Sequence, residues 1–124
     1  MEEKWTLRRH AAKNRVFIIA EGFATEEKSK DAAKEFIELL GSSTVDLVVD
    51  LGKMTGYTSG ARRAWQDCFY PVRKQLKRML VVGSNVPAMV RMGATVVAAV
   101  IGVPISFYGT VDELDDAVAR GKTG

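Results

Sequence analysis

The chain has 124 residues, of which 47% are hydrophobic and 27% charged, proportions that are ordinary for a globular protein. We therefore expect one domain spanning residues 1–124, large enough to bury a core without disulfides or a structural metal. A single Cys and a single His argue against a zinc site, an intrachain disulfide and a Cys–His or Ser–His–Asp catalytic machinery. With no segment like a secretory signal, we expect a cytoplasmic protein without cofactor, metal or enzyme activity.

Charge is distributed unevenly along the chain. Residues 1–57 carry a net charge of −1, residues 58–110 carry +6, and residues 111–124 carry −2. The basic middle predicts either a positive face for an acidic protein, phosphate or anionic lipid, or simply one solvated helix face. Nucleic-acid binding is not expected, because the aromatic residues among these charges fall mostly on an apolar stripe.

The N-terminal third predicts a hairpin followed by a helix. Trp5–His10 and Arg15–Glu21 are predicted as two strands joined by a short turn, and the second contains the β-branched apolar run Val16–Ile19, which indicates an antiparallel pair. Apolar residues at helical spacing then predict a helix over Glu26–Leu40. Thr25 is its expected N-cap and Gly41 its terminating glycine.

The middle third predicts a buried strand and a long helix. Val45–Leu51 is a β-branched apolar run, typical of a strand covered on both faces, and Gly52–Tyr57 contains the turn residues of a loop. A stripe of apolar residues at helical spacing follows, namely Ala61, Ala64, Trp65, Cys68, Phe69, Val72, Leu76 and Met79. Because Pro71 lies within this helix, we expect a kink or a break there.

The C-terminal third predicts two more strands, each followed by a helix. Met79–Val82 is the next strand, and a helix begins near Pro87 and ends at Gly102. Pro104–Tyr108 is the last strand, and the sequence Thr-Val-Asp-Glu from Thr110 is a capping box that opens the last helix.

The order of these elements predicts an α/β fold with a mixed, mostly parallel central sheet, an N-terminal β-hairpin and four to five helices. Residues 92–111 are uncharged over a length that could span a membrane. Because glycines and a proline interrupt the run, we interpret it as a buried helix and strand, with no transmembrane segment.

Two adjacent hydroxyls at the start of the long helix are the most interesting candidate site. Thr58 and Ser59 lie where free amides and the helix dipole favour a phosphate group. Arg62 and Arg63 follow within one turn and could pair with it. The same pattern also fits an ordinary N-cap, so local chemistry leaves both interpretations open.

The residues around this helix start resemble a known family. Asp50 and Leu51, then a connecting segment, then Thr58, Ser59 and Gly60 are similar to the Asp-Leu-Ser…Asp-Ser-Ser-Gly signature of STAS domains. This is the SpoIIAA-like family of bacterial anti-sigma factor antagonists. The resemblance continues nearly to the end of the chain, where the family also has a Thr- or Ser-capped helix.

The resemblance implies a SpoIIAA-like fold and a non-enzymatic, phosphorylation-switched module for protein–protein interaction. Its implied partner is an anti-sigma factor that is also the kinase, and Ser59 takes the place of the phosphoacceptor, with Thr58 beside it. Phosphate on Ser59 would weaken binding of the partner. The implied partner-binding residues are Gly56, Tyr57, Gly60, Arg62 and Arg63, and the family has an acidic residue where this chain has Tyr57.

A second hypothesis is a small binding domain for a lipid or another small apolar ligand. The segment Ala61–Trp65 and a later Val-Val-Gly resemble the SpoIIAA-like branch that is grouped with lipid-binding Sec14-type domains. The pocket would lie beside the basic helix and be formed by Trp65, Phe69, Met89 and Met92. An edge strand or the kinked helix could also expose apolar surface for a homodimer.

Overall fold

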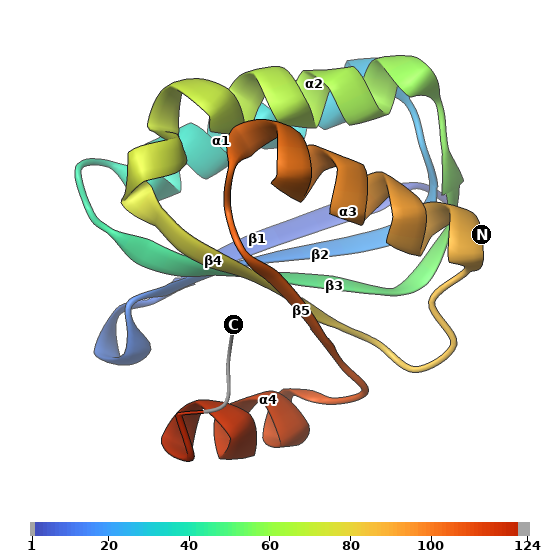
Figure 1. The fold of residues 1–124 in the computed structure, drawn as a ribbon. Helices are drawn as coiled ribbons and strands as arrows, with labels where there is room; N and C mark the ends of the chain where they lie inside the picture. Colours follow the sequence, from blue (N-terminus) through green and yellow to red (C-terminus); the bar gives the residue numbers. More distant parts are fainter. Residues whose placement is uncertain (1, 122–124) are drawn as a thin grey trace.

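The computed structural model describes residues 2–121 and is built around a five-stranded sheet (Figure 1). In chain order the strands are β1 (Lys4–His10), β2 (Arg15–Ala24), β3 (Val45–Tyr57), β4 (Leu76–Val82) and β5 (Ile105–Tyr108). Their order across the sheet is the same as their order in the chain. β1 pairs antiparallel with β2, and the other neighbours are parallel, which confirms the predicted mixed, mostly parallel sheet with an N-terminal hairpin.

Four α-helices accompany the strands in this part of the chain. They are α1 (Glu26–Leu40), α2 (Ser59–Phe69), α3 (Ala88–Ile101) and α4 (Val111–Ala119), with short 3₁₀ helices η1 (Ala11–Lys13) and η2 (Tyr70–Gln75). α1, α2 and α3 cover one face of the sheet and α4 lies on the other (Figure 1). α1, α2 and α3 connect successive parallel strands that follow one another across the sheet in one direction. Because such connections are right-handed, their helices lie on the same face of the sheet.

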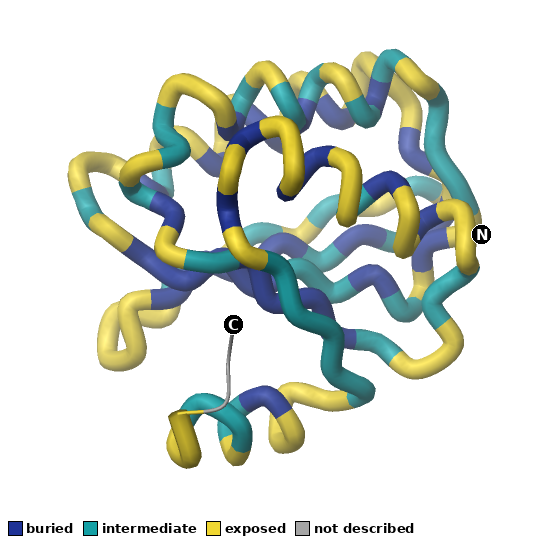
Figure 2. Tube along the Cα trace, viewed as in Figure 1, coloured by how far each residue is buried: buried dark blue, intermediate teal, exposed yellow. Residues whose placement is uncertain are grey.

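Both faces of the central strands are buried, which explains the unbroken apolar runs in their sequences. On β3, Leu47 belongs to the core beneath the three helices, whereas its neighbour Val48 belongs to the cluster under α4. On β4, Val81 and Leu80 divide in the same way, because successive side chains of a strand point to opposite faces. Figure 2 shows the buried stretches gathered in these strands.

Pro71 divides the long predicted helix as expected, but the predicted helical stripe extends into residues that belong to the next strand. α2 ends at Phe69, and Pro71 lies in the first turn of η2. Leu76, predicted on the helical stripe, begins β4 instead, and Met79, predicted both on the stripe and as the start of the next strand, lies within β4. Pro71 interrupts the helical hydrogen bonds, and the apolar residues that follow pair with β3.

The prediction of a loop at Gly52–Tyr57 is wrong, because β3 continues to Tyr57. Its partner β2 also continues, to Ala24, and the two pair through two irregularities in the register. Gly56 lies against the ring of Phe23 so closely that a Cβ at this position would be 2.9 Å from Cε2 of the ring. Glycine here marks a close approach between side chain and strand, and not a turn.

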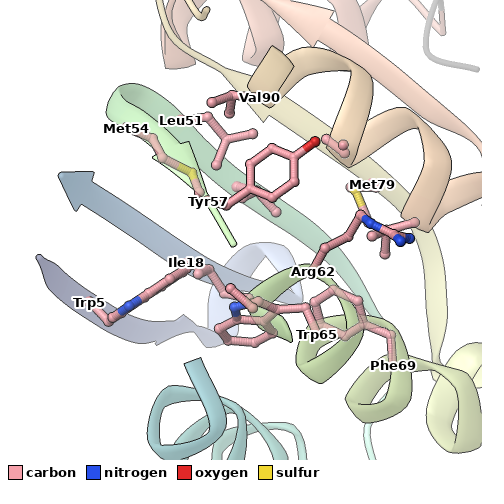
Figure 3. A pocket seen from close by; sticks show the side chains of 15 residues that line it. Trp5, Ile18, Leu51, Met54, Tyr57, Arg62, Trp65, Phe69, Met79 and Val90 are labelled. Carbon is pink, nitrogen blue, oxygen red and sulfur yellow. The ribbon is translucent and has the colours of Figure 1, made fainter. Parts of the chain in front are cut away.

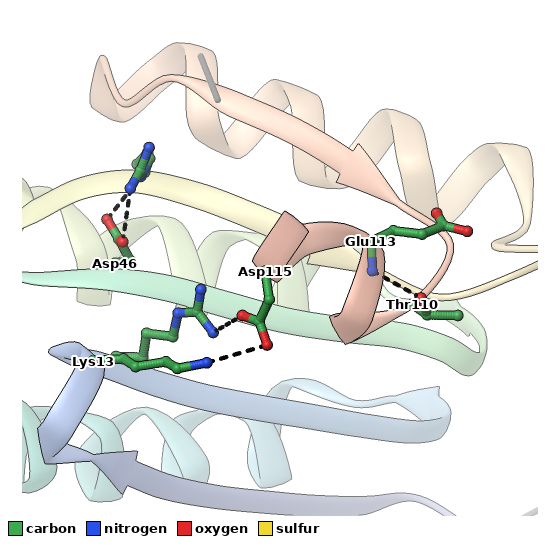
Figure 4. Close-up of polar contacts among 7 residues, drawn as sticks. Lys13, Asp46, Thr110, Glu113 and Asp115 are labelled. Carbon is green, nitrogen blue, oxygen red and sulfur yellow. Dashed lines mark hydrogen bonds and ion pairs between the residues drawn. The ribbon is translucent and has the colours of Figure 1, made fainter. Parts of the chain in front are cut away.

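The helix starts were predicted correctly, although one of them is stabilised differently. Thr110 accepts a hydrogen bond from the Glu113 amide at 3.1 Å (Figure 4), and Glu113 accepts one from the Gly109 amide. Thr25 occupies the N-cap position of α1, but its hydroxyl donates to the Glu3 carboxylate at 2.7 Å. The N-terminal strand segment is thereby tied to the start of α1.

The uncharged run of residues 92–111 is divided between α3 and β5, as predicted from its glycines and proline. Among residues 2–121, no helix has both the length and the hydropathy needed to cross a bilayer.

Candidate functional site

The junction of β3 and α2 distinguishes the two hydroxyls that the sequence leaves equivalent. The Thr58 hydroxyl accepts a hydrogen bond from the Ala61 amide at 3.0 Å and so caps α2. The Thr58 amide also donates to the Ala24 carbonyl at 3.0 Å, at the end of the paired strand. Ser59, the first residue of α2, is exposed, and its hydroxyl forms no hydrogen bond among residues 2–121. Thr58 therefore shapes the junction, and Ser59 is the hydroxyl that faces solvent.

Charged side chains surround the start of α2. The carboxylate of Glu26, at the start of α1, lies against Gly60, where a Cβ would overlap it. The pKa of Glu26 is lowered, chiefly by its hydrogen bond with Lys30 and by the Lys30 charge, with a smaller contribution from Arg63. Exposed Arg63 and half-buried Arg62 lie in the first turns of α2. A group attached to Ser59 would meet both signs of charge.

An apolar pocket of about 90 Å³ lies beneath this junction, between α2, α3 and the sheet (Figure 3). The residues that line it come from β1, β2, β3, β4, α2 and α3, and they are Trp5, Ile18, Val49, Leu51, Met54, Tyr57, Ala61, Arg62, Trp65, Phe69, Met79, Val90, Gly93, Ala94 and Val97. Arg62 is the one charged residue among them. The pocket and the candidate phosphoacceptor thus share the first turns of α2.

Tyr57 closes one side of this pocket. Its hydroxyl donates to the Met89 carbonyl at 2.9 Å and so joins the end of β3 to α3. Its ring fits against Gly93, where a Cβ would lie 2.5 Å from the Tyr57 hydroxyl oxygen. Figure 3 shows the ring extending across the pocket. The residue that departs from the acidic pattern of the family therefore has a structural role in the pocket wall.

Aromatic rings form the floor of the pocket. Trp65 packs against Trp5 with a centroid separation of 5.1 Å and against Phe69 at 5.4 Å. Trp65 is only 8% exposed, and its buried indole N–H has no hydrogen-bond partner among residues 2–121. Buried indole N–H groups usually have a hydrogen-bond partner, so the Trp65 N–H is an unsatisfied donor in the pocket wall.

The predicted pocket residues are only partly brought together. Trp65 and Phe69 line the pocket, whereas Met89 and Met92 lie outside it on α3, with exposed fractions of 63% and 53%. Sequence reasoning did not assign Trp5 or Gly93 to the pocket. Trp5 could have been found from the alternation of β1, because Trp5 and Leu7 lie on one face of the strand between polar neighbours and need partners to cover them.

The predicted contact residues form a continuous stretch around the helix start. Gly56 and Tyr57 end β3, and Gly60 follows Ser59 in the first turn of α2. Gly56 is half-buried under Phe23, and the Phe23 side chain is 50% exposed. The Phe23 ring therefore belongs to the same surface, although it was not among the predicted contact residues.

Cys68, the one cysteine of the chain, is half-buried at the contact between α2 and α1. Burial raises the pKa of the Cys68 thiol to about 12, which keeps it protonated and a poor nucleophile at neutral pH. Its Sγ donates to the Ala33 carbonyl at 3.6 Å. No group of three or more His, Cys, Asp or Glu side chains within residues 2–121 could hold a metal ion.

No family model and no curated protein matches the chain. Solved structures do match. An uncharacterised protein of the DUF3478 family with a SpoIIAA-like fold, from Shewanella loihica PV-4, superposes with a TM-score of 0.69 and 15% identity over 91% of each chain. The anti-sigma factor antagonist SpoIIAA in its unphosphorylated form superposes with a TM-score of 0.56 and 15% identity, over 94% of this chain and 98% of that one. The chain has a SpoIIAA-like fold, as the sequence resemblance implied.

Proposed function

We propose that this SpoIIAA-like chain is a regulatory protein-interaction module whose partner binds the start of α2 and whose binding is switched by phosphorylation of Ser59. One solved structure with this fold is an anti-sigma factor antagonist described in its unphosphorylated form. The proposed partner is of the same kind, an anti-sigma factor with kinase activity. The contact surface runs from Gly56 through Arg63.

The observation that carries the proposal is the contrast between the two adjacent hydroxyls. The Thr58 oxygen already accepts the Ala61 amide, so phosphate there would cost α2 its N-cap. Ser59 is exposed and its hydroxyl has no partner among the described residues, so a kinase can reach it without disturbing the helix. Phosphate at the first position of a helix is also stabilised by the free amides and the dipole.

Phosphorylation would change the charge of this surface without unfolding it. The group adds a charge of about −1.5 to −2 and three strong acceptor oxygens. Arg62 and Arg63 lie within one turn and can pair with it. The ionised Glu26 carboxylate lies against the neighbouring Gly60, so the added charge also repels the start of α1. A partner with an acidic contact surface would bind the modified face less well.

The test combines mapping of the modification with a binding assay. The protein is isolated from its own host, and phosphate is located by fragmentation mass spectrometry, with Ser59 as the expected site. Immobilised wild type and Ser59→Ala should retain the same kinase-related partner from a host lysate. Ser59→Asp should retain much less of it, because the carboxylate imitates part of the added charge.

Ser42→Asp is the matched control, since Ser42 is an exposed serine in the turn after α1. It should retain the partner as the wild type does. Phosphate confined to Thr58, or equal retention by Ser59→Asp and Ser42→Asp, would contradict the proposed switch.

A further inference from the structure

We propose that the pocket between α2, α3 and the sheet binds a small anionic amphiphile, such as a medium-chain carboxylate. Its chain occupies the apolar pocket and its carboxylate pairs with Arg62. The inference rests on the walls of the pocket and does not depend on modification of Ser59.

The lining of the pocket sets the general class of the ligand. Fourteen of its fifteen residues are uncharged, and the only hydroxyl among them, on Tyr57, already donates to the Met89 carbonyl. Arg62 supplies the one formal charge. An apolar pocket with one cation at its wall suits a ligand with an apolar body and one anionic group.

The polar groups of the pocket wall indicate that the charged group of the ligand is an anion. Arg62 forms no ion pair among residues 2–121, and its single contact, from Nη1 to the Gln66 Oε1, is long at 3.3 Å. Arg15 and Arg78, in contrast, each reach a carboxylate. In the described part of the chain, the buried Trp65 N–H likewise has no acceptor. The wall therefore offers donors and a positive charge, so an anion or another acceptor-rich group fits and an amine does not.

Arg62 and Trp65 lie on the same side of α2. They are three residues apart, a spacing that places side chains on one face of a helix. Figure 3 shows Arg62 beside the Tyr57 ring and Trp65 below it, both next to the apolar interior. An anionic head near Arg62 can thus be continuous with a chain that lies along the aromatic floor.

The size of the pocket favours a small ligand over a whole membrane lipid. Its volume of about 90 Å³ is less than the roughly 150 Å³ of an engineered apolar cavity that takes up benzene. Only a few carbon atoms of an eight-carbon chain fit without movement of the walls, so a medium-chain carboxylate is enclosed only when part of the wall moves. We propose that the Tyr57 ring is the part that moves, because one hydrogen bond to the Met89 carbonyl and packing against Gly93 hold its end to α3.

Intrinsic fluorescence gives a direct assay, because both tryptophans of the chain, Trp5 and Trp65, line the pocket. The protein is titrated with octanoate, octan-1-ol and octylamine below their micelle concentrations. Octanoate should cause a saturable change, octan-1-ol should bind about tenfold more weakly, and octylamine should bind most weakly. A tenfold loss is the effect of one charge-assisted contact.

Variants separate the charge from the apolar pocket. Arg62→Gln should weaken octanoate about tenfold and leave octan-1-ol unchanged. Arg63→Gln is the matched control, because Arg63 is the exposed neighbour that does not line the pocket, and it should bind both probes as the wild type does. Ala94→Phe should fill the pocket and remove binding of both probes, with circular dichroism to show that the variant is folded.

Several results would overturn the inference. Equal affinity of wild type and Arg62→Gln for octanoate would remove the role of the cation. Absence of any saturable change with octanoate would remove the site, whether or not Ala94→Phe folds. Binding to phosphatidylglycerol vesicles without binding to octanoate would assign the surface to a membrane instead. These outcomes do not depend on whether phosphorylation of Ser59 controls binding of a partner.

Discussion

The two faces of the sheet are stabilised in different ways. On one face, three helices enclose a large core in which Phe36 packs edge-on against Phe69 at 5.2 Å and against Trp65 at 6.5 Å. On the other face α4 is the only α-helix within residues 2–121, and Leu114 is its one buried residue. Asp115 of α4 also forms ion pairs with Arg15 and with Lys13, which add to that contact (Figure 4).

The contrast shows where the fold can accept imperfect packing. The three-helix face contains a pocket and a buried indole N–H without a partner, features that cost stability and that only a large surrounding core can offset. The α4 face depends on one fully buried leucine, the partly buried Val118 and one charge network. Variants should therefore destabilise the whole protein on the first face and release a single helix on the second.

The largest effect is expected for Phe36→Ala in α1. Phe36 is fully buried among the aromatic rings, so the variant should lower the free energy of unfolding by about 3–5 kcal/mol. Chemical denaturation followed by circular dichroism measures the change. Ile37→Ala is the control, because Ile37 is 40% exposed and should lose well under half as much. Similar losses for the two variants would show that the aromatic cluster is not the centre of the core.

Leu114→Ala should have the next largest effect and a more local one. The side chain is fully buried against Phe17, Val48, Leu80 and Val82, and its truncation should cost about 2–4 kcal/mol. Because α4 has no other buried residue, hydrogen exchange should accelerate in α4 before the rest of the chain. Val111→Ala, in the same helix at an exposed position, should leave exchange unchanged. Uniform acceleration throughout the chain would contradict local release.

Asp115→Asn tests the charge network on the same face. The variant leaves Arg15, only 3% exposed, without its carboxylate, and should cost about 1–2 kcal/mol because Asp115 itself is partly solvated. Asp116→Asn, whose ion pair with Arg120 is exposed, should cost less than about 0.5 kcal/mol. Thermal unfolding of the two variants compares them directly.

The same network predicts a dependence of stability on pH. The pKa of Asp115 is lowered in the folded protein, chiefly by its hydrogen bond with Arg15 and further by Lys13, although burial opposes this. A carboxyl with a lowered native pKa stabilises the fold above its unfolded pKa, and the contribution is lost as the pH falls through the native value. Asp115→Asn should therefore lose less stability on acidification than the wild type does. Identical acid profiles would exclude this contribution.

The smallest expected effect is a gain in stability. Ser29 is fully buried in α1 and its hydroxyl has no partner among the described residues. Ser29→Ala removes an unsatisfied group and improves helix propensity, so the free energy of unfolding should rise by up to about 1 kcal/mol. Ser42→Ala, in an exposed turn, should change it by less than about 0.5 kcal/mol. A clear loss for Ser29→Ala would reveal a bonding partner for the hydroxyl.

Local signals predicted most of the fold. Thr110 with Glu113 marked a helix start, Pro71 marked a helix end, and the apolar run from Val45 marked the central strand, because each acts within one turn or one strand. The extension of β3 from Gly52 onward was missed, since its evidence lies in the pairing with β2 and not in its own residues.

The candidate site was predictable only in part, for the same reason. The hydroxyls at Thr58 and Ser59 were found because a helix start is a local feature, but the choice between them depends on the hydrogen bond from Ala61. The pocket joins Trp5 to Tyr57 and Gly93, residues from β1, β3 and α3. Their proximity follows from the tertiary fold, and no spacing in the sequence indicates it.

The arrangement of the sheet also affects how the chain can fold. Because the order of strands across the sheet is their order in the chain, each strand after β1 pairs with the strand that precedes it in the chain. The hairpin of β1 and β2 consists of sequence-local contacts, and β3, β4 and β5 can each be added to an existing edge together with the preceding helix. No strand has to be inserted between two others. The sheet can therefore grow from the N-terminus during synthesis, with β5 and α4 completing the fold last.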